Sequence, residues 1–115
     1  MYHEKLDVWQ RSCELSVRIY RETDNVKDWG FRNQITRSSL SVPSNIAEGI
    51  EKPTAKDKQK FLYIAKGSLA ELKTQFIIGE KINYIPQEIT KECKQEIEVI
   101  DFMLTRLISS ISGKG

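Results

Sequence analysis

The sequence predicts an all-α protein, a single antiparallel up-and-down four-helix bundle over residues 1–115. Two observations support this fold class. Apolar residues recur every three or four positions in four separate segments, which is the spacing of a helix face. Short segments rich in turn residues separate the four, and short connections place consecutive helices antiparallel. A chain of 115 residues has room for one hydrophobic core, so we expect one domain.

The first two helices are expected over residues 4–22 and 29–48. The apolar arc of the first helix is wider than one core face needs, so we expect part of it to meet a partner subunit. Asp28 is suited to cap the start of the second helix. Gly49 is suited to the left-handed position after its end. Pro43 lies inside this helix and removes a backbone donor, so we expect a kink or a local break near residues 39–43.

The third and fourth helices are expected over residues 54–83 and 86–110. Thr54 and Asp57 resemble a capping box at the start of the third helix. Gly67 lies within that helix at a cost of roughly 1 kcal/mol relative to alanine, which suggests that another backbone approaches there. Pro86 is acceptable as the first residue of the fourth helix. In that helix an apolar row from Ile89 to Ile111 follows heptad-like spacing, which suits bundle packing.

Composition favours a cytoplasmic protein with no membrane partner. No apolar run approaches the length of about 18 residues that a membrane span needs, and the first seven residues mix charges where a signal peptide would be apolar. Cys13 and Cys93 lack the spacing of a zinc site or a disulfide framework, so we expect both to be reduced core residues.

Catalytic, metal and cofactor motifs are missing from the sequence. His3 is the single histidine, and no Glu-x-x-His pair of the kind that binds metals in bundle cores occurs. The six glycines form no phosphate-binding loop. We therefore expect no catalytic residues, no metal ligands, no cofactor and no enzymatic activity.

A polar stripe follows one side of the second predicted helix. Its members fall within an arc of about 100° when each residue advances 100°. They are Gln34, Arg37, Ser38, Ser41, Asn45 and Glu48. Three interpretations stay open: a solvated face, a buried network that aligns helices or subunits, and a binding surface.

Basic residues are concentrated in the middle of the chain, where residues 27–73 hold nine lysines and arginines against five acidic residues. Such an excess can attract phosphates, although a solvated face is an equally physical explanation. Lys56 and Lys60 share one face of the third predicted helix, and Lys66 and Lys73 share a different one. A continuous basic groove would therefore need several copies of the chain.

Several sequence blocks resemble the bacterial family of four-helix bundles named after 23S ribosomal RNA intervening sequences. The blocks include Leu6-Asp7-Val8-Trp9-Gln10, Asn45-Ile46-Ala47-Glu48-Gly49 and Gly67-Ser68-Leu69-Ala70-Glu71-Leu72. Ser38 and Ser39 stand where the family often carries alanine. The resemblance implies no established catalytic activity. It also implies a homo-oligomer, with a pentamer as the favoured form.

Similar bundles are accessory variability determinant proteins of diversity-generating retroelements, thought to bind RNA or DNA and a reverse transcriptase. By analogy, the resemblance implies these partners here and a repeated basic surface as the nucleic-acid contact. The candidate residues are Arg32, Arg37, Lys56, Lys60, Lys66 and Lys73. The alternative is a structural or protein–protein interaction module without nucleic-acid binding, in which the stripe orders subunits and the lysines maintain solubility.

Overall fold

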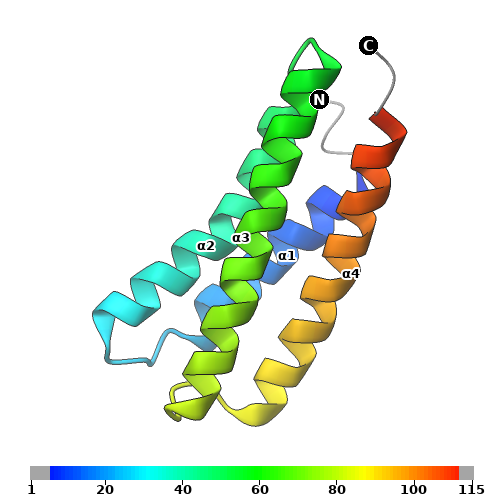
Figure 1. Ribbon diagram of the computed structural model, residues 1–115. Coiled ribbons are helices and arrows are strands. Elements are labelled where there is room, and N and C mark those ends of the chain that lie inside the picture. Colours follow the sequence, from blue (N-terminus) through cyan, green and yellow to red (C-terminus); the bar gives the residue numbers. More distant parts are fainter. Residues whose placement is uncertain (1–5, 112–115) are drawn as a thin grey trace.

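Four helices make up the computed structural model, which describes residues 6–111. They are α1 (Asp7–Glu22), α2 (Trp29–Ile50), α3 (Ala55–Lys81) and α4 (Gln87–Ile111). Consecutive helices run antiparallel, and α4 returns to lie beside α1 (Figure 1). No strand occurs among the described residues. The predicted fold class, an all-α four-helix bundle, is confirmed.

The core is formed by one apolar row from each helix. In α2, α3 and α4 these rows include Ile35, Phe76 and Ile100, none of which is measurably exposed. In α1 the buried apolar residues are Val8, Leu15 and Ile19, whereas Val17 and Tyr20 of the other apolar row remain exposed. The wide arc seen in the sequence thus separates into a core row and an outer row.

The second helix is unbroken at Pro43, so the local break suggested by the sequence does not occur, while the kink suggested there stays a prediction. Asp28 caps its start, because the Asp28 side chain accepts a hydrogen bond of 3.1 Å from the Phe31 backbone N–H. The helix then passes through Pro43 without interruption. Proline removes one backbone donor, and buried side chains on both sides, including Ser39 and Ile46, hold the adjoining turns against the core.

The sequence-based prediction that Gly49 adopts a left-handed conformation after the end of this helix is wrong. Gly49 lies inside α2, which continues to Ile50. A Cβ atom at Gly49 would lie 3.0 Å from the Cβ of Phe61 and 3.1 Å from the carbonyl oxygen of Lys58. Gly49 is therefore required by the close approach of α3 to α2 rather than by a turn.

The ends of the other helices differ slightly from the expected ones. Leu6 is extended, so α1 begins at Asp7, and residues 4 and 5 lie outside the described chain. Thr54 caps α3 as predicted, accepting from the Asp57 backbone N–H at 3.1 Å. The helix ends at Lys81 because Asn83 has a φ of 65°, a left-handed conformation that asparagine tolerates. Pro86 precedes α4 and accepts a hydrogen bond from the Thr90 N–H.

Gly67 does not meet a close backbone neighbour within the chain. A Cβ atom built there would meet no described atom within 4 Å, and the residue is exposed on α3. The prediction that another backbone approaches Gly67 is therefore wrong within one copy of the chain. Among the described helices, none combines the length and the apolar character required to cross a membrane.

Candidate functional site

An apolar hollow of about 430 Å³ lies between α1 and α2. On its inner side the helices approach closely, because Ser16 and Ser39 are small and their hydroxyl groups form a hydrogen bond of 2.9 Å. On its outer side the exposed fractions are 48% for Val17, 45% for Tyr20 and 50% for Leu40. We call this feature the α1–α2 hollow; its lining comprises Cys13, Ser16, Val17, Tyr20, Arg21, Leu40 and Pro43.

The apolar surface continues from the α1–α2 hollow toward the start of α2. Tyr20 also lines a second, smaller hollow of about 130 Å³, together with Trp29 and Arg32. Trp29 is 66% exposed. Large apolar side chains that gather on one face of a small protein usually mark an interaction site. The wide apolar arc of the first helix signalled this surface in the sequence, but its contribution from α2 was missed.

The two cysteines have different surroundings. Cys93 is fully buried, and burial raises the pKa of its thiol to about 11. Cys13 is half-buried at the α1–α2 hollow, and burial raises the pKa of its thiol as well. Both are reduced. Cys93 is the core residue that the sequence predicted, whereas Cys13 lies at the edge of the core.

The polar stripe of α2 falls largely in the groove between α2 and α3. Ser41 and Ser68 join the two helices through a hydrogen bond of 2.8 Å between their hydroxyl groups. The Asn45 side-chain amide donates to the backbone carbonyl and to the hydroxyl oxygen of Ser41, at 2.8 and 2.9 Å. Ser38 is buried. Ser41, Asn45 and Ser68 form a polar network that aligns α2 with α3 inside one chain.

The ends of the stripe are exposed and do not join this network. Gln34 and Arg37 line a small hollow against Glu71 and Gln75 of α3. The side-chain oxygen of Gln75 is buried and has no hydrogen-bond partner among the described residues. At the other end, Glu48 forms an exposed ion pair with Lys52 at 3.8 Å. The structure thus divides the stripe between a helix-aligning centre and two solvated ends.

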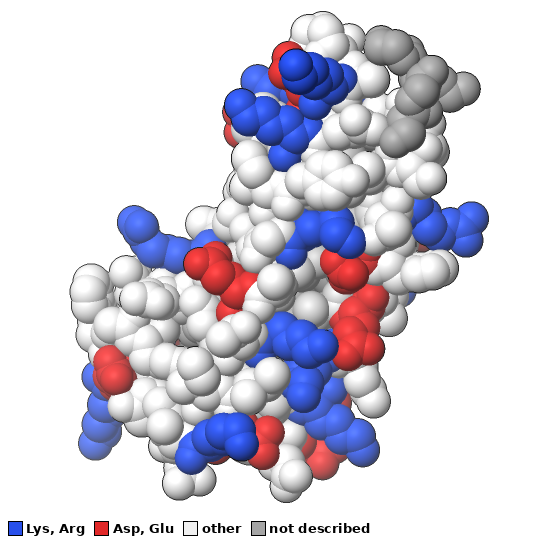
Figure 2. Space-filling view, viewed as in Figure 1, with Lys and Arg blue, Asp and Glu red and all other residues white. Residues whose placement is uncertain are grey.

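Two of the six candidate nucleic-acid contacts are neutralised within the chain. Lys66 pairs with Asp101 at 3.0 Å and donates to the Thr105 hydroxyl group at 2.6 Å. Lys73 pairs with Glu98 at 3.5 Å. Figure 2 shows the result, since blue and red side chains lie next to each other along the α3–α4 face instead of forming a blue band.

The other four candidates lie at three separate places. Lys56 and Lys60 are exposed near the α2–α3 connection, where Figure 2 shows a group of blue side chains. Lys60 lies 6.0 Å from the centre of the Phe61 ring. Arg32 donates to the Asp24 carbonyl at 3.0 Å, on the α1–α2 side. Arg37 lies in the α2–α3 hollow. The structure therefore brings Lys56 and Lys60 together, but not the whole set.

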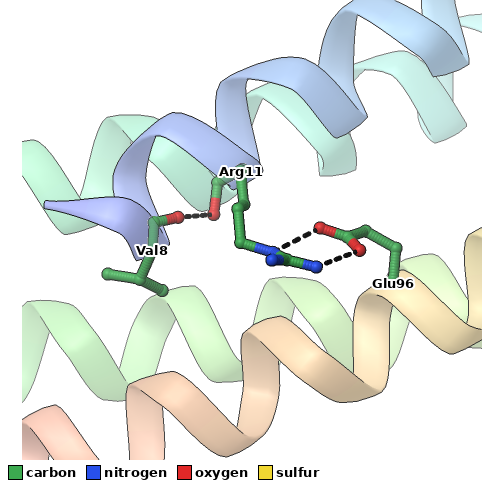
Figure 3. Close-up of polar contacts among 4 residues, drawn as sticks. Val8, Arg11 and Glu96 are labelled. Atoms are coloured by element: carbon green, nitrogen blue, oxygen red, sulfur yellow. Dashed lines mark hydrogen bonds and ion pairs between the residues drawn. The ribbon is translucent and has the colours of Figure 1, made fainter.

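The contact between α1 and α4 is reinforced by two arginines. The guanidinium group of Arg11 makes two hydrogen bonds to the Glu96 carboxylate, at 2.8 and 2.9 Å (Figure 3). These contacts raise the pKa of Arg11. Arg18 pairs with Glu92 one turn earlier on α4. The partners are 85 and 74 residues apart in the chain, so no local sequence pattern indicates these pairs.

The described part of the chain contains no cluster of side chains suited to bind a metal ion. Among residues 6–111, no group of three or more histidine, cysteine or acidic side chains is placed to hold a metal ion. His3, the single histidine, lies outside these residues. The α1–α2 hollow is distinguished by its apolar lining, because a larger hollow of about 640 Å³ near the helix connections is lined mainly by polar residues such as Arg21, Asp24 and Asn83.

The fold and this surface define the class: an antiparallel four-helix bundle with an uncovered apolar face on two of its helices. The match to a family model over residues 4–106 makes the assignment specific. The chain belongs to the family described as 23S rRNA-intervening sequence proteins. This confirms the resemblance carried by the sequence blocks.

A solved structure supports the same assignment. The chain is similar to a protein of unknown function from the S23 ribosomal protein family of Bacteroides thetaiotaomicron, with a TM-score of 0.83 and 25% sequence identity. The match covers 88% of this chain and 97% of that one. No curated protein matches this chain.

Proposed function

We propose that this protein is a non-enzymatic helical bundle that associates with copies of itself through the α1–α2 hollow. One observation carries the proposal: Val17, Tyr20 and Leu40 are each close to half exposed around one concave apolar site. Covering apolar surface gains about 25 cal/mol per Å². A bundle with a complete core therefore has a physical reason to place this surface against a partner.

The resemblance to 23S rRNA intervening-sequence proteins favours a second copy as that partner and a pentamer as the assembly. Homo-oligomers are the common form of soluble assembly, and a repeated contact can generate a closed ring. The proposed role is that of a structural scaffold, in which the surfaces of several associated copies together form the functional unit.

Light scattering coupled to size-exclusion chromatography tests this proposal. We expect the natural protein to elute as a multimer, and Leu40→Lys to shift the mass toward one chain, because the lysine places a charge in the apolar contact. Ile78→Lys is the matched control, since Ile78 is 48% exposed but lies on α3, away from the hollow. A natural protein that elutes as a single chain at all concentrations would contradict the proposal.

A second candidate function is binding of RNA or DNA by the assembled protein. Lys56 and Lys60 favour it, because both are exposed one turn apart on α3, and neither has an ion-pair partner among the described residues. One pair of lysines is a small charge, but repetition around an oligomer would produce a basic ring. Binding to phosphates would then be salt-dependent and largely independent of sequence.

Fluorescence anisotropy with mixed RNA and DNA at two salt concentrations tests this second function. A steep loss of affinity with salt is expected from phosphate contacts. A multimer that binds neither polymer would reject nucleic-acid binding, while leaving the self-association in place.

A further inference from the structure

The outer face of α4 carries a projecting aromatic residue. Phe102 is 62% exposed and lies opposite the core row of its helix, which includes Ile100 and Leu104. The Arg106 guanidinium group lies 5.8 Å from the centre of the Phe102 ring. Phe102 therefore projects from the surface, whereas the α1–α2 hollow is concave. The two surfaces belong to different helices, so one molecule presents both at the same time.

Both surfaces share a pattern of charges around an apolar centre. On α4, Glu98 lies one turn before Phe102 and Arg106 lies one turn after it, and all three side chains are exposed. On α1, exposed Glu14 and Arg21 flank Val17 in the same order, acid before base. Residues three or four apart share a helix face, so each set forms one row.

The order of these charges decides which direction of packing is favourable. If α4 of one copy lay parallel to α1 of another, Glu98 would meet Glu14 and Arg106 would meet Arg21. With the helices antiparallel, Glu98 meets Arg21 and Arg106 meets Glu14. Glu98 also pairs with Lys73 of its own chain, but its side chain stays 67% exposed and open to a second contact. Both helices rise 1.5 Å per residue, so the two opposite-charge contacts form together when Phe102 lies beside Val17.

We infer that the self-association proposed above is head-to-tail, with Phe102 of one copy seated in the α1–α2 hollow of the next and α4 antiparallel to α1. This inference rests on the proposed function and names its interface. The hollow of about 430 Å³ is open enough to admit a phenyl ring, and two hollows facing each other would leave that space unfilled. A head-to-tail contact covers both apolar surfaces in every copy, and it closes into a ring when the rotation between copies permits.

Charge reversal separates this contact from symmetric alternatives. Glu14→Arg and Arg106→Glu are each expected to weaken association by at least about tenfold, because like charges then face each other across the contact. The double variant restores an opposite-charge pair, so its association should return close to that of the natural protein. In a symmetric α1–α1 contact, Glu14→Arg would instead face Arg21, and adding Arg106→Glu would restore nothing.

The measurement is mass by light scattering over a dilution series, with circular dichroism melting to confirm that each variant is folded. Phe102→Asp is a second probe, expected to lower the mass as Leu40→Lys does, and Ile78→Lys is the control. A multimer whose mass is unchanged by Phe102→Asp, or a double variant that fails to recover, would overturn the head-to-tail contact. A natural protein that is a single chain would instead overturn the proposed self-association.

Discussion

Substitution by alanine should have opposite effects on stability at two glycines, Gly67 on the exposed side of α3 and Gly49 on the buried side of α2. At Gly67 an added methyl group meets open space, so Gly67→Ala should stabilise the fold by up to about 1 kcal/mol through helix propensity. At Gly49 the same change would place a methyl group 3.0 Å from the Phe61 Cβ and 3.1 Å from the Lys58 carbonyl oxygen. Both atoms are fixed to the backbone of α3, so the two helices must separate.

We therefore expect Gly49→Ala to destabilise the protein by about 1–2 kcal/mol, despite the same gain in propensity. Urea denaturation followed by circular dichroism measures both variants against the natural protein. Equal effects of the two substitutions would show that α3 does not approach α2 as closely as described.

Asp28 links stability to pH. Its carboxylate accepts from the Phe31 N–H and from the Tyr84 hydroxyl group, at 3.1 and 2.9 Å. The backbone hydrogen bond is the larger cause, and the Tyr84 bond the smaller, of a pKa below the ordinary value of 3.8. The folded state thus binds fewer protons than the unfolded state near that pH. Asp28 stabilises the fold above its ordinary pKa, and this contribution is lost as the pH falls through the depressed value.

The expected result is a stability that rises with pH between the depressed and the ordinary pKa of Asp28. Asp28→Asn keeps a capping oxygen but cannot titrate, so its stability should rise less over this range. Tyr84→Phe removes one of the two main donors and should give an intermediate slope. Thermal melts across the acidic range measure these slopes, and identical slopes for the natural protein and the Asp28→Asn variant would contradict the assignment.

At the scale of the helix, ion pairs decide which basic residues are available to a ligand. Lys66 and Lys73 hold α3 to acidic residues of α4, whereas Lys56 and Lys60 project near the α2–α3 connection. If the protein binds nucleic acid, Lys56→Glu with Lys60→Glu should weaken binding more than Lys66→Glu with Lys73→Glu. Anisotropy titrations at one fixed salt concentration make the comparison, and the opposite order would place the contact on the α3–α4 face.

How much of a helix could be predicted from the sequence also differs between its capped ends and its packed faces. Asp28 and Thr54 were recognisable as caps because each acts on a residue three positions away. The role of Gly49 was not recognisable, because it depends on how closely α3 packs against α2. Periodicity alone also does not determine which side of α1 faces the core, because this helix carries two apolar rows. The packing of α2 and α4 against α1 buries the row that contains Leu15 and Ile19.

At the scale of the whole molecule, the same limit applies to the candidate surfaces. The six basic residues were chosen by composition and family analogy, and the acidic partners of Lys66 and Lys73 come from a helix that is distant in sequence. The α1–α2 hollow combines residues of two helices, so the arc on α1 indicated an interface without locating it. Interaction surfaces need tertiary placement, whereas helices need only local periodicity.

The α1–α2 hollow finally predicts a difference in thiol chemistry between assembled and separated copies. Cys13 lines the hollow, so a partner seated there should shield it from a thiol reagent. Cys93 is fully buried with a pKa of about 11, so it should stay unreactive near neutral pH in any folded state. Cys13 should therefore react faster in Leu40→Lys than in the natural protein, while Cys93 reacts in neither.

Mass spectrometry of each labelled cysteine over time measures the two rates separately, and Cys93 serves as an internal control for unfolding. Ile78→Lys should leave the Cys13 rate unchanged, because it lies outside the hollow. If Leu40→Lys separated the copies without accelerating Cys13, the subunit contact would cover Leu40 but leave the Cys13 side of the hollow open, and a partner side chain seated in the hollow would be contradicted.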